Sequence, residues 1–115
     1  ANYKLDNLTA IVDRNRLQIS GNTEDVMALE PLKSKFEAFG FAVEEVDGND
    51  IGKLREVFRK IPFQAGKPSM ILANTIKGKG ISFMENQAKW HHGTPSADQY
   101  EQAMAELQAE EEAIR

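Results

Sequence analysis

Three short apolar runs alternate with two stretches of helical periodicity, and this alternation constrains the fold more than any other feature of the sequence. Residues 8–12, 41–46 and 69–75 are the expected strands, because they are short, largely apolar and mostly rich in β-branched residues. Between them, residues 32–39 and 51–61 carry apolar side chains at helical spacing. The order strand, helix, strand, helix, strand predicts an α/β fold in which a parallel sheet is flanked by helices.

Turn and cap residues delimit these elements. Pro31 suits the first turn of a helix, where its missing N–H costs nothing, and Gly40 is a natural end for that helix. Residues 13–16 form a polar break after the first strand, and residues 19–23 are expected to form a loop. Residues 47–50 are expected to make a turn and to cap the second helix.

The last third of the sequence is expected to be irregular before a final helix. A loop rich in glycine and lysine begins after Ile76, and Ser96 is the expected N-cap of the helix. Three consecutive glutamates, residues 110–112, oppose the helix dipole near its C-terminal end, so we expect that end to fray. Three positions are expected to face inward: Tyr100, Met104 or Ala103, and Leu107.

The length of 115 residues fits one domain with one hydrophobic core, spanning residues 1–115. Three strands make a small sheet, and sheets of this type normally bury their edges under further strands or a partner. We therefore expect additional upstream structure in the complete fold, and self-association of the chain by itself.

Composition excludes several classes of function. The net charge is −4 and the basic residues are scattered, so no nucleic-acid-binding face is expected. Without cysteine there are no disulfides, thiolate metal sites or cysteine nucleophiles. No run approaches the roughly 20 apolar residues that a membrane span needs, and the first residues do not resemble a signal peptide. A cytoplasmic location is the resulting expectation.

Ligands of open parallel sheets lie beyond the carboxyl ends of the strands, and three polar segments occupy that position. They are residues 13–21, 47–50 and 77–80. The amide oxygen of Asn15 and a neighbouring carbonyl are hard ligands that suit Mg²⁺ or Ca²⁺. Spacing alone favours a simpler interpretation, in which Asp13 and Asn15 form a turn.

Two further segments are candidates for ligand contacts. The Lys-Gly-Lys-Gly loop at residues 77–80 could approach an anion, although its glycine spacing matches neither a Walker motif nor a dinucleotide fingerprint, and a solvated turn is the simpler interpretation. His91 and His92 are the only histidines and could act as acid–base groups. The simpler interpretation is an exposed histidine pair, with no spacing suited to zinc. Trp90 is interpreted as a packing residue.

Several segments, taken in order, resemble the thiamine-diphosphate-binding domain of transketolases. The resemblance covers nearly the whole chain and is greatest with the N-terminal section of transketolases that are encoded as two subunits. It implies a partial three-layer parallel sheet with flanking helices, the later part of a thiamine-diphosphate-binding fold. The matching segments are residues 7–21, 41–51, 67–86 and 90–96.

The resemblance also implies roles for individual residues. Asn15 matches the side-chain ligand of the divalent metal, and Leu17 matches the residue that gives the metal a backbone carbonyl. Ile76 and Lys77 match positions close to the cofactor.

One of the two histidines matches the active-site residue that contacts the diphosphate and the substrate hydroxyl groups. Alignment through His-Gly-x-Pro selects His92, whereas alignment through Trp90 selects His91.

The implied activity is the transfer of a two-carbon ketol unit from a ketose phosphate to an aldose phosphate, with thiamine diphosphate and Mg²⁺ (or Ca²⁺) as cofactors. The implied partners are the remaining transketolase segments or a C-terminal subunit, in a homo-oligomer. Two alternatives stay open: a 1-deoxyxylulose-phosphate synthase-like protein, or a non-catalytic interaction domain that kept the fold.

Two departures from the family pattern bear on activity. Asn49 stands where the family usually has histidine, and no Gly-Asp-Gly segment, whose aspartate is a metal ligand, precedes Asn15 in this chain. The partner domain that supplies the activating glutamate is also outside this sequence. We therefore expect the chain alone to be inactive and to bind the cofactor poorly.

Overall fold

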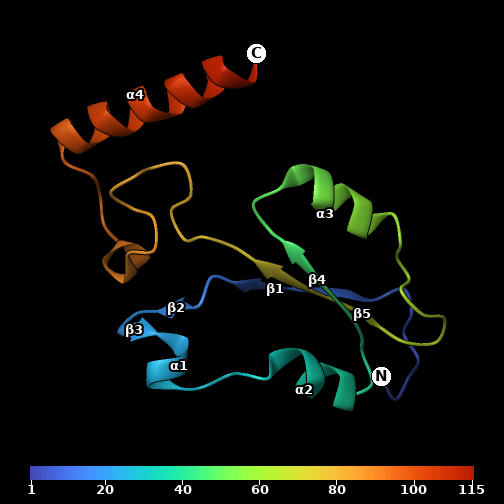
Figure 1. The fold of residues 1–115 in the computed structure, drawn as a ribbon. Coiled ribbons are helices and arrows are strands. Elements are labelled where there is room, and N and C mark those ends of the chain that lie inside the picture. The colour runs from blue at the N-terminus through green and yellow to red at the C-terminus, as the bar shows by residue number, and fades with distance from the viewer. The chain divides into compact units, whose positions relative to one another are not determined.

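The computed structural model describes all residues from Ala1 to Arg115, and they form two compact units. The first unit comprises Ala1–Asn15 and Met27–Thr75, and the second comprises Arg16–Val26 and Ile76–Arg115. In chain order the elements are β1 (Thr9–Arg14), β2 (Leu17–Gln18), β3 (Gly21–Asn22), α1 (Thr23–Val26), α2 (Leu32–Ala38), β4 (Ala42–Asp47), α3 (Ile51–Phe58), β5 (Ser69–Asn74), the 3₁₀ helix η1 (Ala88–His91) and α4 (Ala97–Ile114) (Figure 1).

The first unit is a three-stranded parallel sheet in the order β1-β5-β4, with α2 and α3 on opposite faces (Figure 1). The last strand in the sequence therefore lies in the middle of the sheet. The predicted α/β fold with a parallel sheet and flanking helices is confirmed. β1 continues two residues beyond its predicted end, because pairing with β5 runs in register as far as Arg14 and Asn74.

The core of this unit lies between the sheet and α3. Ile71 at the centre of β5 is completely buried, and Val46, Val57 and Ala73 are buried around it. Residues beyond the helix end also contribute, since α3 ends at Phe58 while Ile61 and Phe63 still pack against the core. The remaining core contact comes from Leu54.

The predicted cap of α3 is present. The Asp50 carboxylate accepts a hydrogen bond of 3.0 Å from the backbone N–H of Lys53, and this bond lowers the pKa of Asp50 below its ordinary value. α2 begins after Pro31, and the backbone turns away from the helix at Gly40, which has a φ of 90°. On the other face of the sheet, Phe36 of α2 meets Phe41 edge-on, with ring centroids 5.9 Å apart.

The second unit contains a short hairpin, η1 and α4. β2 pairs with β3 in antiparallel fashion, and α1 follows directly, so the prediction of a plain loop over residues 19–23 is wrong. Two-residue strands carry no periodic pattern, and the ladder forms because the chain reverses at residues 19–20. The hairpin is closed by a 2.9 Å hydrogen bond from the Thr23 N–H to the Arg16 carbonyl.

The predicted N-cap of α4 is also present. Ser96 accepts a bond from the Gln99 N–H, and the Gln99 side chain accepts one from the Ser96 N–H, which makes a capping box. The helix continues through the three glutamates to Ile114. Ala103 is the buried residue of α4, whereas Tyr100 is 60% exposed and its predicted inward position is wrong.

α4 is anchored to the loop that follows β5. The N–H and the hydroxyl of Ser82 each donate a 2.6 Å hydrogen bond to the Glu106 carboxylate. These bonds, the hydroxyl's first, lower the pKa of Glu106.

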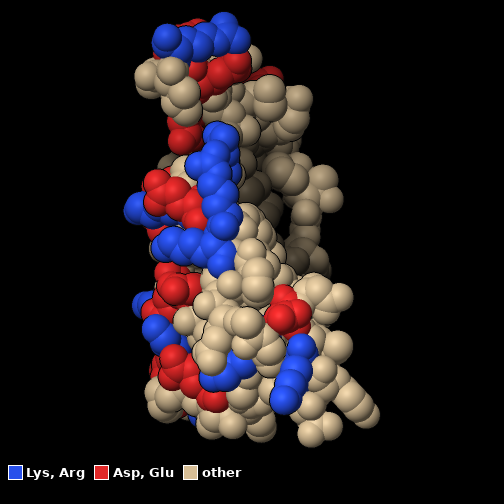
Figure 2. All heavy atoms as spheres, turned by 90° about the vertical axis from the view of Figure 1, so that its right-hand side faces the viewer, with Lys and Arg blue, Asp and Glu red and all other residues tan.

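Charged side chains of both signs are mixed on the surface. On the face drawn in Figure 2, lysine and arginine lie among aspartate and glutamate rather than in a separate basic patch. None of the helices combines the length and the apolar composition that a membrane-spanning helix requires.

Candidate functional site

The carboxyl ends of β1, β5 and β4 lie in one row. Arg14, Asn74 and Asp47 are register partners across the three strands. The polar segments that were expected to follow the strands therefore leave the sheet at a common edge, which is where open parallel sheets place ligands. Within the first unit, this edge carries the segments that begin at Asn15 and Gly48.

Hydrogen bonds tie the three strand ends together. The Thr75 hydroxyl donates to the Asp13 carboxylate, joining the ends of β5 and β1. The Gly48 N–H donates to the Asn74 carbonyl over 2.7 Å, which joins the turn after β4 to β5. These bonds limit the movement of the backbone that presents Asn15.

Only glycine fits at position 48. A Cβ atom built there would lie 2.5 Å from Cγ2 of Thr75 and 2.9 Å from Cβ of Ala73. The chain leaving β4 therefore passes directly over the end of β5, and a side chain would force the two segments apart.

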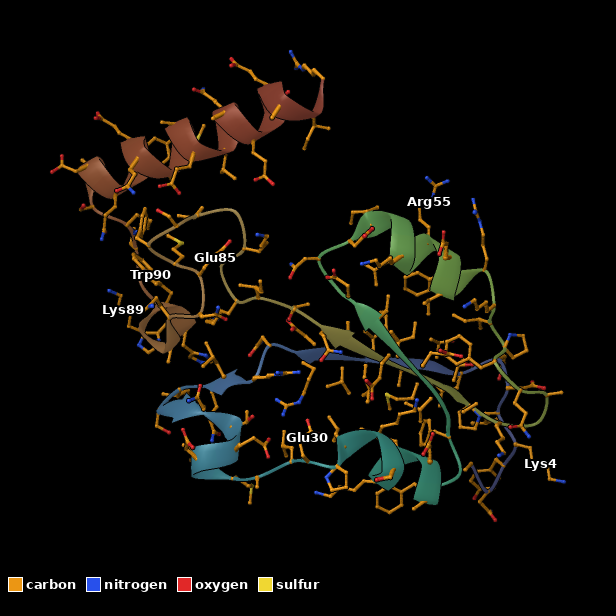
Figure 3. All side chains as sticks on the ribbon, viewed as in Figure 1. Lys4, Glu30, Arg55, Glu85, Lys89 and Trp90 are labelled. Carbon is orange, nitrogen blue, oxygen red and sulfur yellow. The ribbon has the colours of Figure 1, made fainter.

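An ion pair between buried Arg14 and exposed Glu30 supports the residue before Asn15. Arg14 is 5% exposed, and its Nε and Nη2 donate to Oε1 of Glu30 over 3.2 and 2.9 Å. The other oxygen of Glu30 accepts the Leu32 N–H over 2.8 Å at the start of α2. Figure 3 shows Glu30 between α2 and the sheet. Glu30 neutralises the guanidinium, so no unpaired buried cation adjoins the proposed metal ligand.

The second unit holds the other residues that the sequence singled out. Leu17 begins β2, and β2 packs against η1, the helix that ends at His91. The unit therefore brings together the strand of Leu17 and the segment of the two histidines. Gln18, the other residue of β2, has a buried side-chain nitrogen without a hydrogen-bond partner.

The carboxylate of Glu85, which follows the loop at residues 77–80, holds that loop in place. Glu85 accepts hydrogen bonds from the Gly80 N–H and from Nζ of Lys79 over 3.1 and 3.2 Å. The backbone bond, followed by the lysine, lowers the pKa of Glu85. For Lys79 and Gly80 the interpretation as a turn is therefore the better one, since both already hold an anion supplied by the chain.

The loop also needs glycine at position 78. Gly78 has a φ of 74°, and a Cβ there would approach Cβ and the carbonyl oxygen of Met84 to 2.7 Å. The neighbouring Lys77 carbonyl accepts the Asn86 N–H over 2.9 Å. Ile76, the other predicted cofactor neighbour, is 36% exposed.

His91 and His92 end the irregular segment, and both are exposed. Their rings meet edge-on, with centroids 5.8 Å apart. His92 lines a shallow hollow of about 230 Å³ together with four other residues, whereas His91 does not. The other lining residues are Lys89, Trp90, Gly93 and Gln99.

Trp90 packs as predicted. Its ring lies 5.5 Å from that of Phe83, and its Nε1–H donates to the Phe83 carbonyl over 3.0 Å. The indole is thereby fixed as one wall of the hollow. Lys89, which the sequence analysis did not single out, extends from the same short helix (Figure 3). It is exposed and has no hydrogen-bond or ion-pair partner.

No group of three or more His, Cys, Asp or Glu side chains in the chain is arranged to hold a metal ion.

Comparisons with known proteins show which family the chain resembles. Residues 1–113 match the family model described as transketolase, thiamine diphosphate binding domain.

Among curated relatives, one of the subunits of the apulose-4-phosphate transketolase of Phocaeicola vulgatus is 52% identical over 91% of this chain and 37% of its own length. The 6-deoxy-6-sulfo-D-fructose transketolase subunit SqwG of a Clostridium species is 41% identical over 93% of this chain and 39% of its own length. The chain thus spans less than half the length of these relatives.

Solved structures agree with the fold. Transketolase from Campylobacter jejuni superposes with a TM-score of 0.81 at 30% sequence identity, over 93% of this chain and 17% of the larger one. This chain therefore belongs to the transketolase family, and the part of the family that it matches is the thiamine-diphosphate-binding domain.

Proposed function

We propose that this chain is part of an enzyme that transfers a two-carbon ketol unit from a ketose phosphate to an aldose phosphate. The observation that carries the proposal is the 52% identity to a named transketolase subunit over 91% of the chain. Since that relative is one subunit of its enzyme and is longer than this chain, we propose that further transketolase segments or a C-terminal subunit complete the active enzyme.

Thiamine diphosphate and Mg²⁺ (or Ca²⁺) are the proposed cofactors. The donors that this chain offers fit a hard cation: the amide oxygen of Asn15 and the backbone carbonyl of Leu17. Two oxygens are too few for the six positions that Mg²⁺ prefers, so diphosphate oxygens, water and a carboxylate from outside this sequence would supply the rest. The strand-end hydrogen bonds and the neutralised Arg14 support this role, because they hold the Asn15 segment in place.

Bound thiamine diphosphate supplies an electron sink for breaking and making the carbon–carbon bond next to the ketose carbonyl. Ile76 and Lys77 are proposed to adjoin it, as the resemblance implies. An imidazole can bind a sugar hydroxyl and hold or release its proton. We assign this role to His92 rather than His91, because His92 lines the hollow beside Trp90.

The names of the relatives support a proposal for the substrate class. Apulose 4-phosphate is the first ketose to assay, because two subunits named for it are 52% and 47% identical to this chain. 6-Deoxy-6-sulfo-D-fructose, which carries a sulfonate instead of a phosphate, is a second ketose to assay, since SqwG is 41% identical. We further propose that residues 1–115 work as the later part of one cofactor-binding domain, in a cytoplasmic homo-oligomer.

A calorimetric titration of this chain with thiamine diphosphate and Mg²⁺ tests the proposed ligand set. We expect no detectable heat, because the chain offers only two of the proposed oxygen donors. Binding at micromolar concentration would overturn the assignment of Asn15 and Leu17 as half of a shared site.

A second experiment tests the function itself. In the assembled enzyme, Asn15→Ala is expected to weaken Mg²⁺-dependent cofactor binding by about 10–100-fold, the loss that weakened metal coordination typically causes. The matched control is Asn2→Ala, at an exposed position outside the sheet. Unchanged metal dependence in Asn15→Ala would contradict the site, and no ketol transfer from any ketose phosphate by the assembled wild type would contradict the function.

A further inference from the structure

Asn15 follows the end of the pairing between β1 and β5, where the backbone hydrogen bond is long. At the start of this pairing, the Ser69 N–H donates to the Leu8 carbonyl over 2.9 Å. At its end, the Thr75 N–H donates to the Arg14 carbonyl over 3.4 Å, beyond the range of about 2.7–3.2 Å that such bonds prefer. The backbone alone therefore holds the end of β1 less firmly than its start.

The residue after Asn15 adds strain at this end of the strand. Arg16 has a φ of 64°, in the left-handed region that residues other than glycine rarely adopt. Such a conformation is unfavourable and persists only where surrounding contacts restrain the chain. The turn that carries Asn15 therefore needs a restraint in addition to the backbone hydrogen bonds of the sheet.

The side chains of Arg14 and Glu30 supply such a restraint. The guanidinium of Arg14 is 5% exposed, and its Nε and Nη2 donate to Oε1 of Glu30 over 3.2 and 2.9 Å. Oε2 of Glu30 accepts the Leu32 N–H over 2.8 Å, so the carboxylate joins the end of β1 to the start of α2 (Figure 3). Because two nitrogens of one planar group bind the same oxygen, the orientation of Arg14 is fixed as well as its distance from Glu30.

The backbone of Glu30 is held separately from its side chain. Nζ of Lys35, in α2, donates to the carbonyls of Leu29 and Glu30 over 2.7 and 3.4 Å. Replacing the carboxylate of Glu30 should therefore preserve the course of the chain into α2 and release mainly Arg14. The Glu30 side chain is also 53% exposed, so water can reach a neutral amide at this position.

We infer that Glu30 is a positioning residue for the proposed metal site, since it acts through Arg14 to fix the turn that presents the Asn15 amide oxygen. This inference rests on the proposed function, because the divalent cation belongs to that proposal. Residues that orient metal ligands without touching the metal typically change metal affinity by about 10–100-fold when they are replaced. Glu30 and Arg14 thus add a supporting layer to the ligands that the family resemblance implies.

Amide hydrogen exchange of the 115-residue chain, followed by NMR, tests the restraint without any ligand. In Glu30→Gln we expect exchange of the Thr75 amide to become about tenfold faster, as the loss of a hydrogen bond to a charged group would give. The Ser69 amide, at the other end of β5, is the internal reference and should exchange as in the wild type.

Glu37→Gln is the matched control, because it removes the same charge from an exposed position on α2. Both amides should exchange in this variant as they do in the wild type. Equal acceleration of Thr75 and Ser69 in Glu30→Gln would overturn the inference, because the ion pair would then stabilise only the fold as a whole. The same acceleration of Thr75 in Glu37→Gln would also overturn it.

A second measurement follows the metal in the assembled enzyme. With thiamine diphosphate present, Glu30→Gln is expected to weaken Mg²⁺ binding by about tenfold in a calorimetric titration, and KM for the ketose at saturating Mg²⁺ should stay the same. Combining Arg14→Met with Glu30→Gln removes both charges and should restore the free energy of unfolding, but not the Mg²⁺ affinity. Restored Mg²⁺ affinity in this double variant would overturn the positioning role, because neutralising the buried charge would then be sufficient.

Failure of this inference can be told apart from failure of the proposed function. Unchanged Mg²⁺ affinity in Glu30→Gln, with intact ketol transfer, would remove Glu30 from the site and leave the function standing. An assembled wild-type enzyme without ketol transfer would contradict the function, whereas the hydrogen-exchange result involves neither metal nor substrate.

Discussion

Replacing Ile71 by alanine should remove a large share of the stability of the sheet. Ile71 is completely buried at the centre of the middle strand, where it packs among Val46, Val57 and Ala73. The substitution deletes three carbon atoms, which corresponds to about 2.4 kcal/mol of lost transfer free energy. A cavity between two packed layers adds to that, so we expect the free energy of unfolding to fall by about 3–4 kcal/mol.

The same substitution at Ile11 provides a matched control. Ile11 is the register partner of Ile71 on β1 and lies on the same face of the sheet, but 54% of its surface is exposed. The substitution therefore removes only about half of the transfer free energy, and no closed cavity forms. We expect the free energy of unfolding to fall by about 1 kcal/mol.

Urea denaturation followed by far-ultraviolet circular dichroism measures both losses. For a chain of 115 residues a total stability of about 6–17 kcal/mol is typical, so both variants should remain folded in water. The slope of unfolding free energy against urea should stay constant, and the midpoint should shift. Equal losses at the two positions would refute the reasoning, because burial would then not decide the energetics of this sheet.

Three further predictions concern the second unit and one loop of the first. Gly78→Ala should lower the free energy of unfolding by about 2–3 kcal/mol in a thermal unfolding experiment. Gly66→Ala is the control, because Gly66 has the same φ of 74° but open space around it, and it should lower the free energy of unfolding by about 1 kcal/mol. Similar losses in the two variants would mean that the contact with Met84 is unimportant. Gln18→Met should raise the free energy of unfolding by about 1 kcal/mol, since it removes a buried donor without a partner, and a loss would indicate an unseen acceptor. At pH values above the ordinary glutamate pKa of 4.5, Glu85→Gln should lower the melting temperature, because it removes the charged acceptor of two hydrogen bonds. The difference from the wild type should vanish as the pH falls through the lowered pKa of Glu85 in the folded protein, because the wild-type carboxylate then loses its charge. A difference in melting temperature that persists at low pH would contradict the hydrogen-bonded role of the carboxylate.

The sheet could be predicted from the sequence because its periodicities are local. Three apolar runs and two amphipathic stretches are each long enough to show a pattern, and all five elements are present in the structure. The strand ends differ by one or two residues, because pairing between neighbours, rather than composition, decides where a strand stops. Asp13 and Arg14 are polar, yet both belong to β1, since β5 offers them partners.

The hairpin and the face of α4 could not be predicted for the opposite reason. β2 and β3 have two residues each, and their pairing depends on a reversal that composition does not specify. Tyr100 has the spacing of an inward residue, but it is 60% exposed, whereas Ala103 is buried and Glu106 is hydrogen-bonded to the loop that follows β5. Spacing indicates which residues share a face of a helix, and the neighbours decide how much of that face is covered.

The two lysine-containing segments of the second unit show what spacing leaves undetermined about a site. In the sequence, the Lys-Gly-Lys-Gly loop is the more conspicuous candidate for anion binding, and Lys89 is an ordinary lysine beside a tryptophan. The structure weakens the case for the loop, because Glu85 already holds Lys79 and the Gly80 N–H, while Lys89 lines a hollow without a counter-ion. A cation that already has a carboxylate must lose that bond before it can bind a ligand, whereas Lys89 exchanges only water.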